Sequence, residues 1–211
     1  MKKFGVFGTS GFAREVGDIA YQLGFEPIYI ARDQSEADGV TFSGDVVLER
    51  DVMQLKDADF AIGIGDNLVR HHVSARYSNL LRFANLIHPS ATFGRGQLEA
   101  FASRMGVIVC AGVRLTNSIK VGDFNIFNLN VTVGHDVIFE DFINVAPGAN
   151  ISGNVHIEAN CWIGTGAVIN QGNSENKLRI GTNTTVGSGS VVVKSCDPDA
   201  IYVGIPAKRI K

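Results

Sequence analysis

The feature of this sequence that most constrains its fold is an apolar residue that recurs every six positions. From Val109 to Ile169, eleven consecutive positions at this spacing are apolar. We call this six-residue apolar repeat the beat, and it resumes at Ile180, Val186 and Val192. An α-helix cannot produce this spacing, because six is not a multiple of its 3.6-residue period. Short strands that turn a corner every six residues can produce it, since each strand then points the same position inward.

A second inward position follows four residues after each apolar residue of the beat. It carries small or apolar side chains such as Val131, Ala149 and Cys161, with Asn125 and Asn173 as exceptions. Three such hexads make a triangular coil, and stacked coils make a parallel β-helix. The counted hexads predict roughly five coils of about 18 residues each. A β-sandwich is disfavoured, because its strands repeat every 8–12 residues or so.

The first 86 residues lack the beat and alternate between strand-like and helix-like segments. The patterns predict strands at residues 3–7, 26–31, 59–64 and 83–87, and helices at residues 12–23, 46–56 and 67–81. This order predicts a parallel sheet in a small Rossmann-like α/β domain. We therefore predict two domains, residues 1–86 and 87–211. Residues 95–104 interrupt the beat as an irregular loop or a deformed first coil. Residues 174–179 should form a protruding loop that can contact a neighbouring subunit.

Charge and composition exclude several classes of protein. With 19 Lys and Arg against 21 Asp and Glu, the net charge of -2 disfavours a general nucleic-acid binder. The longest uncharged run, residues 159–174, contains several Asn and Gly, and the apolar start ends by residue 10, so we expect neither a membrane span nor a signal peptide. Three Cys without metal-ligand spacing favour a reducing compartment. We therefore expect a cytoplasmic protein with no metal, membrane or nucleic-acid partner.

Two short motifs are candidates for chemistry. His135 lies two places after the beat at Val133 and faces outward, and Asp136 could orient it or merely balance its charge. The turn Gly8–Gly11, between a strand and a helix, suits a diphosphate, but it lacks the full G-x-G-x-x-G pattern and could be only a tight turn. The other histidines are interpreted as a boundary cap, a solvated helix face and a surface residue, namely His88, His71 with His72, and His156. Cys161 and Cys196 are expected in the core, with Cys110 undecided.

The arrangement resembles the hexapeptide-repeat acyltransferases, specifically sugar-nucleotide N-acetyltransferases similar to the bacillosamine-pathway enzyme. Sialic-acid O-acetyltransferases are close relatives of that group. The matching stretches are residues 8–12, 61–67, 87–90, 134–136, 147–148, 152–154 and 203–208, so the match spans essentially the whole chain. The resemblance implies a left-handed β-helix, a homotrimer, and acetyl-CoA bound between neighbouring subunits.

The resemblance also implies roles for individual residues. His135 is the expected general base and Asp136 its orienting partner. The nucleotide-linked sugar is expected at Ser10, Gly11 and Phe12, at Arg32 and Asp33, and at Gly65. Acetyl-CoA is expected at Asn144, Gly153, Thr165, Ser188 and Lys208.

Two of these positions differ from the family or need comment. Arg32 stands where the family's uridine site carries an acid, so the base could belong to UDP, dTDP or GDP. Asn144 stands where the family often has His, so it would position the thioester but could not exchange a proton. Gly153 could offer a main-chain N–H to an oxyanion.

The sequence therefore predicts an acetyl-CoA-dependent N-acetyltransferase that acts on a nucleotide-linked 4-amino-4,6-dideoxy sugar for surface glycan (lipopolysaccharide or polysaccharide) biosynthesis. Two alternatives stay open at this point. The first is an O-acetyltransferase of a sialic-acid-like sugar, which would not need a nucleotide on its acceptor. The second is a non-catalytic protein that binds a sugar nucleotide.

Overall fold

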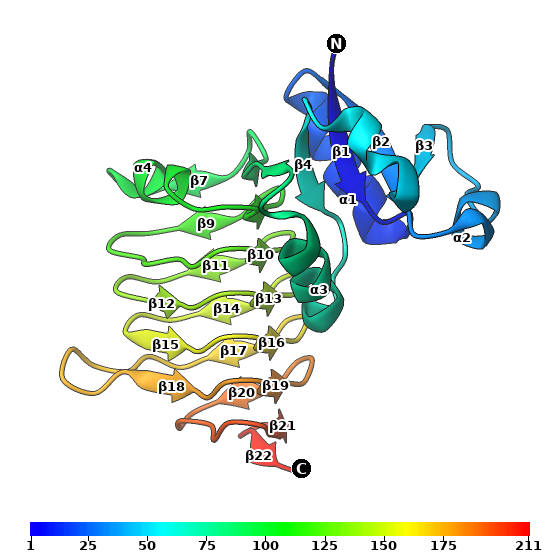
Figure 1. The fold of residues 1–211 in the computed structure, drawn as a ribbon. Helices are drawn as coiled ribbons and strands as arrows, with labels where there is room; N and C mark the ends of the chain where they lie inside the picture. The colour runs from blue at the N-terminus through cyan, green and yellow to red at the C-terminus, as the bar shows by residue number, and fades with distance from the viewer.

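The computed structural model describes residues 1–211 as a stack of short strands with an α/β sheet beside its upper coils (Figure 1). The α/β sheet is parallel and has the order β3-β2-β1-β4-β5. Its strands are β1 (Lys2–Phe7), β2 (Phe25–Ala31), β3 (Asp45–Leu48), β4 (Asp59–Ile62) and β5 (Arg82–Phe83). Its helices are α1 (Gly11–Gln22), α2 (Gln34–Asp38), the 3-10 helix η1 (Glu49–Leu55) and α3 (Asn67–Tyr77). The predicted parallel, Rossmann-like sheet is confirmed.

Two details of this region differ from the prediction. Residues 46–56 were expected to be helical, but their first part is the edge strand β3 and only the remainder is η1. The β-branched pair Val46 and Val47 suits a pleated surface and pairs with Tyr29 and Ile30 of β2, so tertiary pairing overrides the local helical pattern. Residues 83–87 are two strands and not one, because β5 pairs with β4 whereas β6 (Leu86–Ile87) pairs with β8 in the stack. The division at residues 86 and 87 into two domains stays a prediction.

The stack is a parallel β-helix with three faces. The eight-stranded sheet contains β6, β8 (Ile108–Val109), β10 (Ile126–Phe127), β13 (Asn144–Val145), β16 (Trp162–Ile163), β19 (Thr185–Val186), β21 (Ile201–Val203) and β22 (Lys208–Arg209). The six-stranded sheet contains β7 (Thr92–Phe93), β9 (Arg114–Leu115), β11 (Thr132–Val133), β14 (Asn150–Ile151), β17 (Val168–Ile169) and β20 (Val191–Val192). The three-stranded sheet contains β12 (Ile138–Phe139), β15 (Val155–Ile157) and β18 (Leu178–Ile180).

The six-stranded sheet counts six coils, one more than predicted. The extra coil is the first one, which carries the short helix α4 (Gln97–Ala102) where we expected an irregular loop or a deformed coil. Gln97 fixes this insertion, because its buried side chain donates to the Ile119 carbonyl and accepts from the Ile119 N–H. The second interruption, around residues 173–177, protrudes from the stack between β17 and β18 as expected (Figure 1). Its contact with a neighbouring subunit stays a prediction.

The six-residue period appears in the backbone as well as in the core. The apolar beat forms one cluster of 27 buried residues along the axis of the stack. From Gly106 to Gly166, a residue with positive φ recurs at every sixth position. Most of these corners carry Gly, Asn or Asp, which tolerate the left-handed conformation. Ser118, Phe124 and Phe142 are the exceptions, and the two phenylalanine rings stack 5.2 Å apart on neighbouring coils.

The α/β sheet is joined to the eight-stranded sheet by a shared apolar cluster. Phe4 and Val6 of β1 and Val16 of α1 belong to the same buried group as Leu86, Ile108 and Ile126, which point outward from the stack. Helix α3 runs down beside β10, β13 and β16 (Figure 1). The N-terminal sheet and its helices therefore sit against one face of the β-helix.

Candidate active site

The predicted catalytic pair lies on the corner between the six-stranded and three-stranded sheets. His135 and Asp136 follow β11 and precede β12. The His135 Nδ1 lies 2.8 Å from the Asp136 Oδ2, and the two side chains are 60% and 49% exposed. Because Asp136 engages Nδ1, the Nε2 of a neutral imidazole is left free to accept a proton. An accessible, oriented base would need this arrangement, and the catalytic role of the pair stays a prediction.

Gly153 lies directly beneath the His135 ring on the next coil. A Cβ added at Gly153 would lie 2.7 Å from the His135 Nε2 and 2.8 Å from its Cε1. Only glycine therefore lets the imidazole rest on the coil below. The main-chain N–H of Gly153 has no hydrogen-bond partner within the chain, whereas its carbonyl accepts from the Gly172 N–H.

The protruding loop reaches the same corner through Lys177. The Lys177 Nζ donates to the Asp136 carbonyl at 2.5 Å and lies 3.5 Å from the Asn154 Oδ1. Asn173 shapes the loop, because its Oδ1 accepts from the N–H groups of Glu175 and Asn176. Sequence reasoning missed Lys177 because no motif marks it. Its contact with Asp136 depends on how the inserted loop folds back over two coils.

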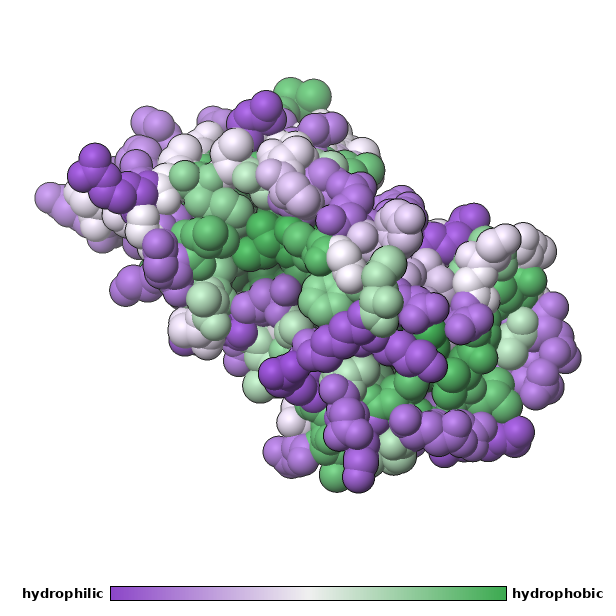
Figure 2. All heavy atoms as spheres, turned by 90° about the horizontal axis from the view of Figure 1, so that it is seen from above, coloured by the Kyte–Doolittle hydropathy of each residue, from purple (hydrophilic) through white to green (hydrophobic).

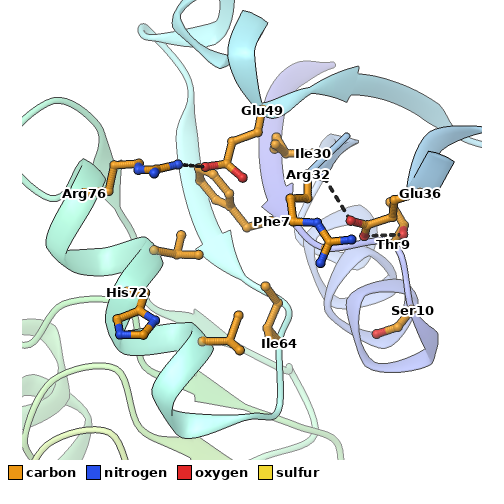
Figure 3. Close-up of a pocket in the computed structure, with 13 residues that line it drawn as sticks. Phe7, Thr9, Ser10, Ile30, Arg32, Glu36, Glu49, Ile64, His72 and Arg76 are labelled. Carbon is orange, nitrogen blue, oxygen red and sulfur yellow. Dashed lines mark hydrogen bonds and ion pairs between the residues drawn. The ribbon is translucent and has the colours of Figure 1, made fainter. Parts of the chain in front are cut away.

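A cavity of about 410 Å³ lies at the carboxyl ends of β1 and β2, where it faces α3 (Figure 3). In Figure 3, Thr9, Ser10, Arg32 and Glu36 come from one side, and His72 and Arg76 of α3 face them from the other. The lining residues are Phe7, Gly8, Thr9, Ser10, Ile30, Arg32, Glu36, Glu49, Ile64, Val69, His72, Val73 and Arg76. Ligands of open parallel sheets bind at this edge, so the cavity is the natural place for a nucleotide.

Two carboxylates organise the charged rim of the cavity. Glu36 accepts from the Thr9 hydroxyl at 2.6 Å and from the Arg32 N–H at 3.0 Å. Glu49 accepts from Arg76 at 2.7 Å and from the Tyr77 hydroxyl at 3.0 Å. The bond to Glu49 raises the pKa of Arg76, and burial together with Glu49 raises the pKa of Tyr77. Sequence reasoning missed both acids, because their roles appear only when α2 meets the turn after β1 and η1 meets α3.

The six residues predicted to bind the sugar nucleotide lie in different surroundings, and only two of them line the cavity. Ser10 and Arg32 line the cavity, whereas Phe12 packs on the apolar cluster behind it and Gly11 begins α1. Asp33 caps α2 by accepting from the Glu36 N–H, and this hydrogen bond lowers the pKa of Asp33. Gly65 faces the β-helix, where its carbonyl accepts from Asn144. Their part in binding stays a prediction.

The predicted acetyl-CoA residues occupy different faces of the stack. Thr165 and Ser188 are exposed on the corner between the eight-stranded and six-stranded sheets, on successive coils linked by the bond from the Gly189 N–H to the Thr165 carbonyl. Lys208 is exposed in the terminal hairpin of β21 and β22. Asn144 belongs to the eight-stranded sheet, and Gly153 to the corner of His135. One chain does not bring these residues into a single site.

The remaining polar candidates have structural surroundings. His88 caps its turn by accepting from the Ser90 N–H, His71 packs on the Phe142 ring, and His156 pairs with Glu140. His72 is exposed as expected but also lines the cavity. Burial raises the pKa of all three thiols to about 12. Cys161 and Cys196 are buried as predicted, and Cys110, which the sequence left undecided, is buried as well.

Two whole-molecule findings accompany these placements. No group of three or more His, Cys, Asp or Glu side chains is arranged to hold a metal ion. None of the helices combines the length and the apolar character that crossing a membrane would require.

The fold and the oriented His–Asp pair define a class, the left-handed β-helix acyltransferases with an N-terminal α/β domain. Residues 3–77 match the family model of the PglD N-terminal domain. GDP-perosamine N-acetyltransferase of Escherichia coli O157:H7 is 28% identical over 224 residues, which cover all of this chain and 97% of that protein. The structure of WeeI from Acinetobacter baumannii AYE is similar with a TM-score of 0.87 and 30% identity over the full length of both chains.

A further solved structure carries ligands. PerB from Caulobacter crescentus, in complex with CoA and GDP-perosamine, matches with a TM-score of 0.86 and 25% identity over 100% of this chain and 98% of that one. The chain belongs to the hexapeptide-repeat acyltransferase family, with an N-terminal domain of the PglD type. The predicted family and the predicted fold class, a Rossmann-like α/β domain followed by a left-handed parallel β-helix, are confirmed.

Proposed function

We propose that this chain is an acetyl-CoA-dependent N-acetyltransferase that acts on a nucleotide-linked 4-amino-4,6-dideoxy sugar. The observation that carries the proposal is the exposed His135–Asp136 pair, in which the His135 Nδ1 lies 2.8 Å from the Asp136 Oδ2. The ring of His135 rests above Gly153, which has no side chain and so leaves room for it. Relatives that match over nearly their whole length are named for this chemistry or hold its ligands, with GDP-perosamine in two cases. A GDP-linked sugar is therefore the first acceptor to test, before UDP- and dTDP-linked ones.

The proposed reaction is direct transfer of an acetyl group from the thioester to the amine. The amine nitrogen attacks the thioester carbonyl carbon, the carbon–sulfur bond breaks, and CoA leaves as its thiolate, which takes up a proton to give the free thiol. The His135 Nε2 takes the proton that the nitrogen loses as the new bond forms. In this proposal Asp136 holds the imidazole by its Nδ1 and stabilises the imidazolium. The N–H of Gly153, which has no partner in the chain, would donate to the oxyanion.

We further propose that the active site forms between neighbouring copies in a homotrimer. The cavity borders α3, which rests on the corner at Phe124 and Phe142, whereas His135 lies on another corner of the same stack. An acceptor in the cavity of one copy would therefore meet the His135 of the next. Thr165, Ser188 and Lys208 offer exposed groups down a third edge, which suits an extended ligand such as acetyl-CoA.

The surface supports association of this kind. Seen from above, hydrophobic side chains gather in two areas with hydrophilic residues between them (Figure 2). Large hydrophobic residues that are at least a third exposed in one chain include Leu98, Met105, Leu129 and Trp162. Such residues are often covered when subunits meet. Sedimentation should give a trimer, and a stable monomer with full activity would contradict this part of the proposal.

The test of the proposed function is turnover of the His135→Ala variant beside binding of both ligands. GDP-, UDP- and dTDP-linked 4-amino sugars are incubated with acetyl-CoA, and release of free thiol is followed. His135→Ala should lower kcat by about 10²–10⁴ while calorimetry finds both affinities nearly unchanged. Near-normal turnover would eliminate His135 as the base. Acetylation of a free sialic-acid-like sugar, or no turnover of any sugar, would favour the O-acetyltransferase or the non-catalytic alternative. A cytoplasmic location and a part in surface glycan synthesis belong to the same proposal.

A further inference from the structure

Asn144 occupies a distinctive place among the residues that point outward from the eight-stranded sheet. Above it in the same ladder, Leu86, Ile108 and Ile126 are fully covered by the N-terminal sheet and α1. Below it, Trp162 is 36% exposed. Asn144 is therefore the first polar residue of the ladder and lies at the lower edge of the junction.

The Asn144 amide is directed at the N-terminal region and away from solvent. Its Nδ2 donates to the Gly65 carbonyl at 2.9 Å, and its Oδ1 is enclosed without a partner. A carbonyl can only accept, so this bond fixes which end of the amide faces Gly65. The whole residue is 3% exposed, and it leaves little surface for a ligand.

Arg70 holds the same turn from the other side. Its guanidinium donates to the carbonyls of Ile64 and Gly65 at 3.1 and 3.0 Å. It also donates to the carbonyls of the stacked corner residues Phe124 and Phe142 at 2.9 and 3.0 Å. Arg70 is fully buried, and burial lowers its pKa to about 9, which leaves it charged at pH 7.

Asn67 extends this clamp to the next coil. Its Oδ1 accepts from Arg70 at 2.8 Å, and its Nδ2 donates to the carbonyls of Asn160 and Cys161. Residues 124, 142 and 160 are corner positions on three successive coils. The first turn of α3 is therefore bonded to three coils at once, and the Gly65 turn is held between Arg70 and Asn144.

We propose that Asn144 and Arg70 are positioning residues that fix the Gly65 turn against the β-helix, and that Asn144 acts through this turn and not as a ligand of CoA. The inference rests on the proposed function, in which the turn belongs to the sugar-nucleotide side and the coils to the acetyl side. Because the Gly65 turn is bonded to the coils, it fixes how a sugar bound by the N-terminal region is oriented relative to the β-helix. Displacements of about 1 Å are enough to lower a rate strongly, because reacting atoms must lie about 3–3.5 Å apart.

The test uses Asn144→Ala with Asn150→Ala as its matched control. Asn150 is also a strand asparagine whose amide donates to a glycine carbonyl, that of Gly148 at 2.8 Å, but it lies on the six-stranded sheet. Trp162 is the single tryptophan and lies beside Gly65, where an added Cβ would be 3.9 Å from its ring. Its fluorescence therefore reports on the turn without any need for turnover.

In Asn144→Ala, we expect the quenching of Trp162 fluorescence by iodide to rise about twofold or more, because the Gly65 turn loses its bond to the β-helix. The Kd of CoA should stay within about twofold, and kcat should fall by roughly tenfold or more. Arg70→Lys keeps the charge with fewer donors and should change quenching and kcat in the same directions. Asn150→Ala should change none of the three.

A CoA affinity weakened more than about fivefold in Asn144→Ala, or unchanged quenching, would overturn the inference. The first result would make Asn144 a ligand of CoA. If the wild-type protein acetylates no 4-amino sugar, the proposed function fails, but quenching and CoA affinity still decide the role of Asn144.

Discussion

The most direct steric test of the proposed base is the substitution Gly153→Ala. The added methyl would lie 2.7 Å from the His135 Nε2, 2.8 Å from its Cε1 and 3.1 Å from its Cδ2. Ordinary contacts of this kind are at least about 3.4 Å, so the ring must move by roughly 0.7 Å or rotate away. The φ of Gly153 is not in the left-handed region, so alanine adds no backbone strain at this position.

A shift of this size should cost much activity and little stability. His135 is 60% exposed and bonded only to Asp136, so the ring can yield without disturbing the core. Misplacement of a reacting group by about 1 Å can cost about 10²-fold in rate. We therefore expect kcat of Gly153→Ala to fall by roughly 10–100-fold, with a melting temperature within about 3 °C of the wild type.

The assay follows thiol release from acetyl-CoA beside a thermal melt and calorimetric binding of CoA. Gly39→Ala is the matched control, because Gly39 has an ordinary helical φ and a Cβ added there meets nothing closer than 3.5 Å. A Gly153→Ala enzyme with near wild-type kcat would refute the argument that the resting position of the ring is the productive one. A large loss of stability would show instead that the corner itself depends on glycine.

Three further outcomes can be checked on the same protein. Arg70→Met should lower the free energy of unfolding in urea by about 3–5 kcal/mol, because it leaves buried carbonyls unpaired, whereas the exposed Arg76→Met should cost under about 1 kcal/mol at the same protein concentration. Asp136→Asn should lower kcat less than His135→Ala does, and equal losses would show that the two roles are misassigned. The thiols of Cys110, Cys161 and Cys196 have pKa values raised to about 12, so they stay protonated at pH 8. A disulfide reagent should therefore label none of them in the native protein and all of them after unfolding. Rapid labelling of the native protein would contradict this expectation.

Much of the β-helix follows from the sequence alone. An inward residue at every sixth position needs only local information, because each coil repeats the contacts of the one before it. The same period fixed the outward direction of His135 and the inward direction of Cys161, and both are as predicted. Most N-terminal strands and helices were predictable from the order of their patterns. The exceptions are β3, whose pairing with β2 overrides a helix-like run, the segment 83–87, which divides into β5 and β6, and the short helix α2, which was not predicted.

Tertiary structure alone decided how the parts of the site meet. Arg70 and Asn67 look like ordinary polar residues of an exposed helix, yet folding buries them on corner carbonyls 54 to 94 residues away in the chain. Glu36 and Glu49 become the rim of one cavity, and Lys177 reaches Asp136, because loops of different length return to the same place. Local patterns record which way a side chain leaves the backbone. They do not record which distant carbonyl it will meet, since that depends on how one folded part packs against another.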